Sequence, residues 1–207
     1  MKRGCQAKLP TLDNSPASAG IRKGMFFMHP DIEKILITPE QLDCKVSEMA
    51  KKISADYAGQ EVLLVTLLKG GVMFSVDLMR KLTVPVEIDF MDVSSYGAGT
   101  KTTGAVKIEK DLDGDIGGRH VLLVEDIVDS GVTLSYVREL LSDRKPASLK
   151  ICTILNKPSR RRMEVPVEYI GFDIPDEFVV GYGLDFAQKH RNLPYVGILK
   201  RSVYEKV

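Results

Sequence analysis

Apolar residues along the chain alternate between short runs typical of strands and longer stretches with helical spacing. The runs predict strands at 62–68, 86–93, 104–110, 121–124 and 149–155. Helical spacing predicts helices over 38–59, over 72–79, and from a turn at 130–133 to about 141. Because strands and helices alternate through short turns, we expect an α/β fold with a doubly wound, mainly parallel sheet flanked by helices.

The first of these helices has a clear N-terminal signal. Thr38 is a capping residue, Pro39 suits the first helical position, and Gln41 completes a capping box. The sequence therefore predicts the start of this helix closely.

The pattern changes after residue 155, where short β-rich pieces at 167–172, 178–182 and 196–199 are separated by prolines. We expect these pieces, from about 156–207 and with 32–37 added, to form a small hood over a core of about 38–155. A cleft between the core and the hood is a natural ligand site. Residues 1–20 lack apolar periodicity and predict a mobile leader, which leaves 21–207 as a single domain.

Composition narrows the choice of partner. The chain has 207 residues, and its 29 basic and 28 acidic side chains give a net charge of +1. This balance argues against nucleic acid or a membrane as the partner and favours a small molecule. Cys5, Cys44 and Cys152 are odd in number and widely spaced, which predicts thiols in a reducing, cytoplasmic compartment.

The most informative stretch is 121–133. A buried apolar strand ends at two acids, Glu125 and Asp126, and the turn of Ser130 to Thr133 then opens a helix. Free backbone N–H groups at a helix N-terminus suit a phosphate. Two adjacent carboxylates need cations or hydroxyl donors, which a hydrated Mg²⁺ and a ribose supply. The alternative is a surface loop with acids near an N-cap. Capping accounts for one acid and not for all three of Glu125, Asp126 and Asp129.

Five stretches, in this order, resemble motifs of the hypoxanthine-guanine phosphoribosyltransferases, the 6-oxopurine branch of the type I phosphoribosyltransferases. They are 67–71 (LLKGG), 94–97 (SSYG), 124–131 (VEDIVDSG), 155–161 (LNKPSRR), and 171–175 with 179–185 (GFDIP and VVGYGLD). The resemblance implies the type I phosphoribosyltransferase fold. It also implies transfer of the 5-phosphoribosyl group from phosphoribosyl diphosphate to N9 of hypoxanthine or guanine, giving IMP or GMP and diphosphate.

The resemblance assigns the sugar-phosphate contacts to the central stretch. Glu125 and Asp126 contact the ribose hydroxyls directly or through Mg²⁺, the expected cofactor. The 5-phosphate is held by the turn of Asp129, Ser130, Gly131, Val132 and Thr133. Some relatives carry a lysine at the position of Val132, so here phosphate binding depends on backbone N–H groups and hydroxyls.

It also assigns the chemistry of the base. Asp129 matches a general acid/base near purine N7, although a carboxylate here also fits helix capping. Lys157 matches a lysine that donates to the 6-oxo group and so favours oxopurines over adenine. Ile127, Phe178 and Val179 match neighbours of the purine, with core packing as the alternative. Asp185 is expected beside the purine and at a second Mg²⁺.

Diphosphate is expected to contact Lys69, Gly70, Ser95, Tyr96 and Arg191. Lys69-Gly70 corresponds to a family position with a cis peptide bond, and 94–104 resembles a mobile flap that closes during reaction. The adjacent Arg160, Arg161 and Arg162 are interpreted as a solvated or subunit-contact face. His29, His120 and His190 match no motif and receive no role.

Two rival functions stay open at this point. One is a xanthine-preferring transferase, which differs in the contacts around Val179 and Asp185. The other is a regulator on the same fold that senses nucleotides without catalysis, because fold alone does not separate the two. By analogy with the family we expect a homodimer or a homotetramer.

Overall fold

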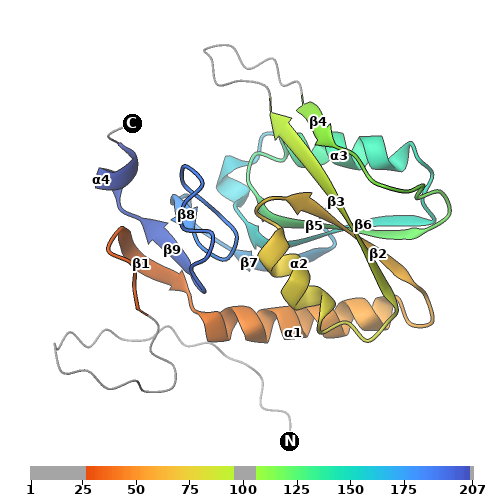
Figure 1. Cartoon of the computed structure of the whole chain (residues 1–207), viewed down its shortest axis with the longest axis horizontal. Helices are drawn as coiled ribbons and strands as arrows, with labels where there is room; N and C mark the ends of the chain where they lie inside the picture. Colours follow the sequence, from red (N-terminus) through yellow and green to blue (C-terminus); the bar gives the residue numbers. More distant parts are fainter. Residues whose placement is uncertain (1–26, 96–105, 206–207) are drawn as a thin grey trace, which may run out of the picture.

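The large sheet has six strands, and β5 lies near its centre, between β2 and β6. In the computed structural model, which describes residues 27–95 and 106–205, the order is β4-β3-β2-β5-β6-β7 (Figure 1). The strands are β2 (Val62–Leu68), β3 (Val86–Ser95), β4 (Val106–Lys110), β5 (His120–Val128), β6 (Ser148–Asn156) and β7 (Tyr169–Asp173). All neighbours pair in parallel except β3 and β4, which are antiparallel. The expected mainly parallel α/β fold is confirmed.

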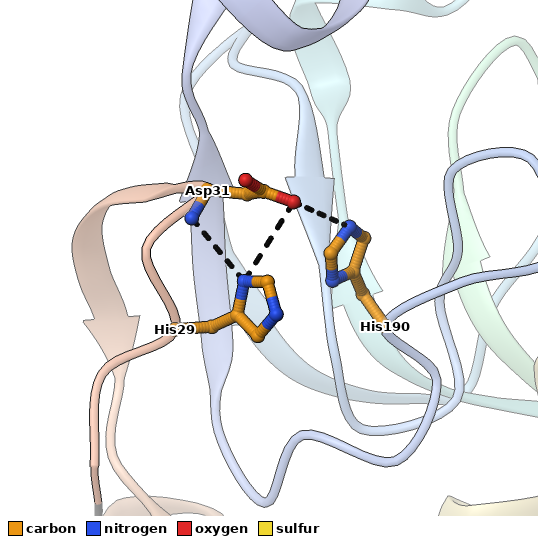
Figure 2. Close-up of side chains that lie close together, drawn as sticks. All are labelled: His29, Asp31 and His190. Atoms are coloured by element: carbon orange, nitrogen blue, oxygen red, sulfur yellow. Dashed lines mark hydrogen bonds and ion pairs between the residues drawn. The ribbon is translucent and has the colours of Figure 1, made fainter.

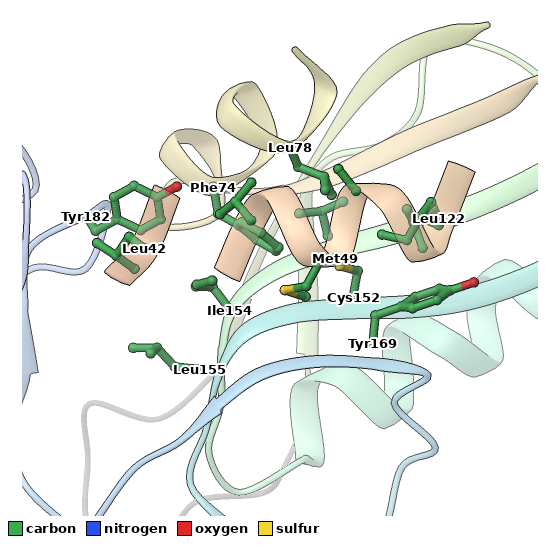
Figure 3. Close-up of a cluster of buried hydrophobic side chains, with 14 of the residues drawn as sticks. Leu42, Met49, Phe74, Leu78, Leu122, Cys152, Ile154, Leu155, Tyr169 and Tyr182 are labelled. Carbon is green, nitrogen blue, oxygen red and sulfur yellow. The ribbon is translucent and has the colours of Figure 1, made fainter. Parts of the chain in front are cut away.

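Two helices cover one face of this sheet and a third covers the other. Side chains of α1 (Pro39–Asp56) and α2 (Val72–Met79) pack with Val62 and Leu64 of β2, as Figure 3 shows for part of this cluster. Side chains of α3 (Val132–Ser142) pack with Leu63 and Val65 instead. Because successive strand residues point to opposite faces, β2 is buried on both sides, as its sequence, apolar except for Thr66, predicts.

The start of α1 is fixed by its cap. The Gln41 N–H donates to the Thr38 hydroxyl at 3.3 Å, and the Thr38 N–H donates to Gln41 Oε1 at 2.8 Å. Leu42, Val46 and Ile53 then face the sheet and are buried. The predicted capping box is confirmed.

A second, three-stranded antiparallel sheet forms the hood. Its strand order is β1 (Ile32–Ile37), β9 (Val196–Leu199) and β8 (Val179–Val180), so residues near both ends of the chain pair here. A four-residue helix, α4 (Arg201–Tyr204), follows β9. Among the described helices, none is long and apolar enough to cross a membrane.

Two details of the expected layout differ. The piece at 167–172 was assigned to the hood, but β7 pairs with β6 and belongs to the large sheet. Strand β5 also continues past Val124 to Val128, so Glu125 and Asp126 lie within the strand. Parallel pairing with β6 extends to Val128, and these ladder hydrogen bonds hold the acids in extended backbone.

Candidate active site

The two acids of β5 face each other closely enough to affect each other's charge. The Asp126 N–H donates to Glu125 Oε1 at 3.0 Å, and the Ile127 N–H donates to Asp126 Oδ1 at 2.7 Å. Burial, reinforced by the negative charge of Asp126, raises the pKa of Glu125 well above its usual value. A cation bound at this pair would stabilise the charged form of Glu125.

The donor set suits Mg²⁺. Mg²⁺ binds carboxylate oxygens and keeps part of its water shell, and Glu125 and Asp126 offer such oxygens at the carboxyl-terminal half of β5. Asp185, the third expected ligand, is engaged elsewhere: Oδ1 lies 2.6 Å from Arg191 Nη2, and Oδ2 accepts the Gln188 N–H at 2.8 Å. The β5 pair therefore offers carboxylates with no cationic partner among the described residues, whereas an ion at Asp185 would share that carboxylate with Arg191.

The turn after β5 forms the floor of a small cavity. Gly131 has a φ of +80° and caps α3, so the first N–H groups of the helix have no intrahelical acceptor. A cavity of about 110 Å³ is lined by Glu125, Ile127, Val128, Asp129, Ser130, Gly131, Thr133 and Leu134. A Cβ at position 131 would also overlap the Met163 carbonyl, so only glycine fits. The turn thus presents amides and hydroxyls to a space of phosphate size.

Asp129 has one carboxylate oxygen without a donor. Its Oδ1 atom is buried and accepts no hydrogen bond from the described residues, while Oδ2 lies 3.9 Å from Arg160 Nη1. The N-cap of α3 is Gly131, and the first helical N–H, that of Val132, donates to Ser130 Oγ at 3.4 Å and not to Asp129, so this carboxylate does not cap the helix. A buried acceptor without a hydrogen bond lowers the stability of the fold. A ligand that donates a hydrogen bond to Oδ1 would remove this penalty.

The run of three arginines does more than form a solvated face. Arg161 Nη1 donates to the Asp129 carbonyl at 3.1 Å, and its Nη2 donates to Asn156 Oδ1. Arg160 Nε lies 2.8 Å from Asp176 Oδ1. Arg160, Arg161 and Arg162 line a cavity of about 400 Å³ together with Asp129, Ser130, Ser159 and Asp176. Arg161 in particular fixes the backbone of Asp129, a contact between residues far apart in the sequence.

Lys157 lines a further cavity, which shares Arg160 and Asp176 with the cavity of about 400 Å³. It follows β6, its N–H donates to the Val128 carbonyl at 2.9 Å, and its ammonium donates to the Glu177 carbonyl at 2.8 Å. The side chain is buried, and the nearest carboxylate, Asp176, is 3.9 Å away. An ammonium in this position is available to an acceptor such as an oxo group.

The residues expected around a base divide between exposed and buried positions. Phe178 is 39% exposed, whereas Val179 is buried in β8 and Ile127 packs at the edge of the same core. A cavity of about 170 Å³ is lined by Lys157, Arg160, Asp176, Glu177, Phe178, Arg201 and Tyr204. Phe178 is therefore an aromatic surface beside Lys157 and not simply core.

A glycine contact joins the core to the hood. A Cβ at Gly70 would overlap the Asp126 carboxylate, and a Cβ at Gly183 would overlap the Gly70 carbonyl. Arg191 Nη1 donates to the Gly183 carbonyl at 2.7 Å. The loop after β2, the β5 acids and the Arg191–Asp185 ion pair are thus brought together, with the exposed Lys69 side chain at the same loop.

The cis peptide bond precedes the expected one. It joins Leu68 to Lys69, whereas the sequence expectation was Lys69-Gly70. Of the two flap residues, Ser95 is the last residue of β3 and Tyr96 lies outside the described residues, as do the leader residues 1–20 and most of the expected flap at 94–104.

Comparison with known proteins agrees with this geometry. The model of the phosphoribosyl transferase domain matches residues 33–187. The hypoxanthine phosphoribosyltransferase of Salmonella typhimurium is 56% identical over 79% of this chain and 93% of its own length. The chain belongs to the hypoxanthine phosphoribosyltransferase family.

Other members of the family agree in both sequence and structure. The crystal structure of a hypoxanthine phosphoribosyltransferase from Staphylococcus aureus superimposes with a TM-score of 0.81 at 46% identity, covering 84% of this chain and 95% of that one. The bifunctional protein TilS/HprT of Listeria monocytogenes is 49% identical over 86% of this chain, which spans only 28% of the length of that relative. The expected fold class is thereby confirmed.

Sequence reasoning did not identify two residues at this site. Arg161 lies in the recognised stretch 155–161 but was interpreted as surface, and Tyr204 lies in a short C-terminal helix outside every motif. The arginine run after Lys157 was an available signal. No pattern in the sequence places Tyr204 beside Phe178.

Proposed function

We propose that the chain transfers the 5-phosphoribosyl group from phosphoribosyl diphosphate to N9 of hypoxanthine or guanine, giving IMP or GMP and diphosphate. The observation that carries this proposal is Asp129. Its unsatisfied, buried oxygen lies where the sugar-phosphate turn begins, and its neighbour Val128 is hydrogen-bonded to the loop of Lys157. Asp129 thus adjoins both the turn proposed to hold the sugar phosphate and the loop proposed to hold the purine.

In this proposal Asp129 removes a proton from the purine near N7 as the new glycosidic bond forms. Arg160 Nη1 lies 3.9 Å from Asp129 Oδ2, and Arg161 donates to the Asp129 carbonyl, so both arginines help to position this residue. Glu125 and Asp126 hold the ribose hydroxyls and place negative charge near the oxocarbenium-like centre. The amides and hydroxyls of Ser130, Gly131, Val132 and Thr133 hold the 5-phosphate. When Mg²⁺ is bound at Glu125 and Asp126, it neutralises charge on the diphosphate.

Selection of the base follows from Lys157 and the aromatic ring beside it. The Lys157 ammonium donates and does not accept, so it favours a 6-oxo group and disfavours a 6-amino group. Phe178 stacks on the purine, and Ile127 and Val179 bound its edges. The Glu177 carbonyl, which now accepts from Lys157, gives up part of that bond when the oxopurine arrives.

The leaving group contacts the loop after β2 and the hood. Lys69 and Gly70 offer an ammonium and backbone groups, and Arg191 offers a guanidinium beside Asp185. Asp185 contributes to the purine subsite and to a second Mg²⁺ once diphosphate competes for Arg191. Ser95 and Tyr96 also contact the diphosphate. The flap to which they belong excludes water, which would otherwise capture the cationic sugar.

A steady-state assay with four bases tests the proposal. Phosphoribosyl diphosphate is offered with hypoxanthine, guanine, xanthine or adenine, with and without Mg²⁺, and nucleotide formation is followed by chromatography. Turnover of hypoxanthine or guanine that needs Mg²⁺, with adenine inactive, is the expected result. Turnover of xanthine in preference to the others would replace the substrate assignment. Binding of nucleotide without turnover of any base would instead support a regulator.

Assembly and location are proposed on analogy and composition. We infer a homodimer or a homotetramer, which sedimentation of the purified chain distinguishes from a monomer. We also infer that residues 21–207 act as one domain in the cytoplasm, with a leader at 1–20. Removal of that leader should leave turnover unchanged.

A further inference from the structure

Three side chains in the hood meet outside the site described above. His29 and Asp31 lie in the turn that opens β1, and His190 lies in the loop between β8 and β9 (Figure 2). The two imidazoles and the carboxylate come from opposite ends of the chain, and their ligand atoms all lie within 4.8 Å of one another. His190 is buried, and the other two side chains are partly exposed.

The distances are longer than those of good hydrogen bonds. Asp31 Oδ2 lies 3.4 Å from His190 Nε2 and 3.7 Å from His29 Nδ1. Hydrogen bonds to nitrogen fall at about 2.7–3.2 Å. Two ligands held at about 2.0–2.2 Å by a tetrahedral ion are about 3.3–3.6 Å apart. The 3.4 Å separation therefore falls within the edge length of a coordination polyhedron, the 3.7 Å separation is slightly longer, and neither is a direct hydrogen bond.

The tautomer of His29 adds a second argument. The Asp31 N–H donates to His29 Nδ1 at 3.2 Å, so Nδ1 acts as an acceptor and carries a lone pair. Nδ1 and Asp31 Oδ2, which lie 3.7 Å apart, are then both acceptors and share no proton. Two facing acceptors favour a cation. A metal would share or replace this hydrogen bond, so we expect moderate affinity.

The surrounding hydrogen bonds hold the ligands in place. The His29 N–H donates to Tyr195 Oη at 2.8 Å, and the Lys200 N–H donates to the Asp31 carbonyl at 2.9 Å. On the other side, the Leu193 N–H donates to the His190 carbonyl at 3.1 Å, and His190 has a φ of +74°. Backbone contacts thus orient both ligand-bearing turns before any ion arrives, which lowers the cost of binding.

We propose that His29, Asp31 and His190 bind Zn²⁺, or a divalent ion of similar preference, and so fasten the start of β1 to the loop before β9. Two nitrogen ligands select an ion of this class over Mg²⁺, which prefers oxygen. Three protein ligands leave at least one position for water. The site shares no residue with the carboxylate pair of β5, Glu125 and Asp126.

Titration with Co²⁺, a spectroscopic substitute for Zn²⁺, tests the proposal. The full chain is stripped with EDTA and then kept in millimolar Mg²⁺, which occupies the carboxylate pair. The wild-type chain should bind one equivalent of Co²⁺ with a visible absorption band, and Zn²⁺ should displace it. Zn²⁺ should also raise the Tm, and excess EDTA should reverse the rise.

Substitutions at the site give the decisive comparison. His190→Gln and Asp31→Asn should each weaken Co²⁺ binding by roughly tenfold or more. His120→Gln is the matched control, because His120 lies at the start of β5, hydrogen-bonded to Ser148 at 2.9 Å. It should bind as the wild type does. Melting in EDTA verifies folding of each variant, and either site variant that folds decides the result. Wild-type affinity in a folded site variant, or no binding by the wild-type chain, would overturn the proposal.

Discussion

Phe178 and Tyr204 are stacked, with ring centroids 5.1 Å apart and an angle of 20° between the rings. Phe178 also meets the edge of Phe186 at 5.7 Å. The ring proposed to hold the purine is thus itself held from two sides, once by the hood loop and once by α4. Since both Phe178 and Tyr204 line the cavity of Lys157, the C-terminal helix forms one wall of the proposed base site.

Replacement of Tyr204 by leucine should therefore affect the base and not the sugar. Aromatic pairs contribute about 0.5–1.5 kcal/mol, which corresponds to about a 2-fold to 12-fold change. We expect the KM for hypoxanthine to rise by that factor while the KM for phosphoribosyl diphosphate stays unchanged. Tyr204→Phe, which keeps the ring, should restore the wild-type KM. An equal rise in both KM values would show that α4 acts only on general stability.

Asp129→Asn should lower turnover by about a hundredfold or more, because the amide cannot take the purine proton. Binding of IMP, measured by calorimetry, should change little. Asp113→Asn is a suitable control, since Asp113 is an exposed acid whose partner is Lys110. Near-normal kcat in the Asp129 variant would remove this residue from the chemical step.

Gly70→Ala should impair the proposed transfer reaction by displacing Asp126, whose carboxylate occupies the space of the new methyl group. We expect kcat/KM for phosphoribosyl diphosphate to fall by about tenfold or more, because a misplaced group at the reacting centre is costly. Gly114→Ala provides the comparison, as no atom lies within 4 Å of a Cβ there. If both variants keep wild-type kcat/KM, the contact between Gly70 and Asp126 has no functional weight.

The raised pKa of Glu125 predicts a pH-dependent effect on stability. An acid whose pKa is higher in the folded state stabilises the fold below its unfolded pKa, and this contribution is lost as pH rises through the folded value. In EDTA, Glu125→Gln should therefore gain stability relative to the wild type between about pH 5 and about pH 8. Urea unfolding of both proteins at both pH values measures how the difference in their free energies of unfolding changes with pH. A difference that does not vary with pH would mean that Glu125 ionises normally.

Local patterns predicted much of this molecule. The apolar residues of β2, interrupted only by Thr66, predicted burial on both faces, and the Thr38–Gln41 signal placed the start of α1 correctly. The motif around Asp129 located the turn and its cavity, since a helix N-terminus after a central strand is determined by neighbouring residues. These features depend on contacts within a few residues or on strand order alone.

Features made by distant residues were not predicted. Membership of β7 in the large sheet depends on pairing with β6, which hydrophobicity in a five-residue strand does not determine. The contact of Arg161 with Asp129 and the stack of Tyr204 on Phe178 join separate segments. The meeting of His29 with His190 is of the same kind, because only the pairing of β1 with β9 brings the two turns together.

The close approach of Gly183 to Gly70 has a consequence for engineering and for evolution. In the proposed function the hood supplies Phe178 and Val179 to the base and the sheet holds the sugar phosphate, and the lack of a side chain at Gly183 leaves room for the Gly70 carbonyl. A hood transplanted from a relative with another base preference must therefore bring a residue without a side chain at this seam. Exchange of the whole hood is then limited by backbone packing at this contact as well as by the residues that contact the base.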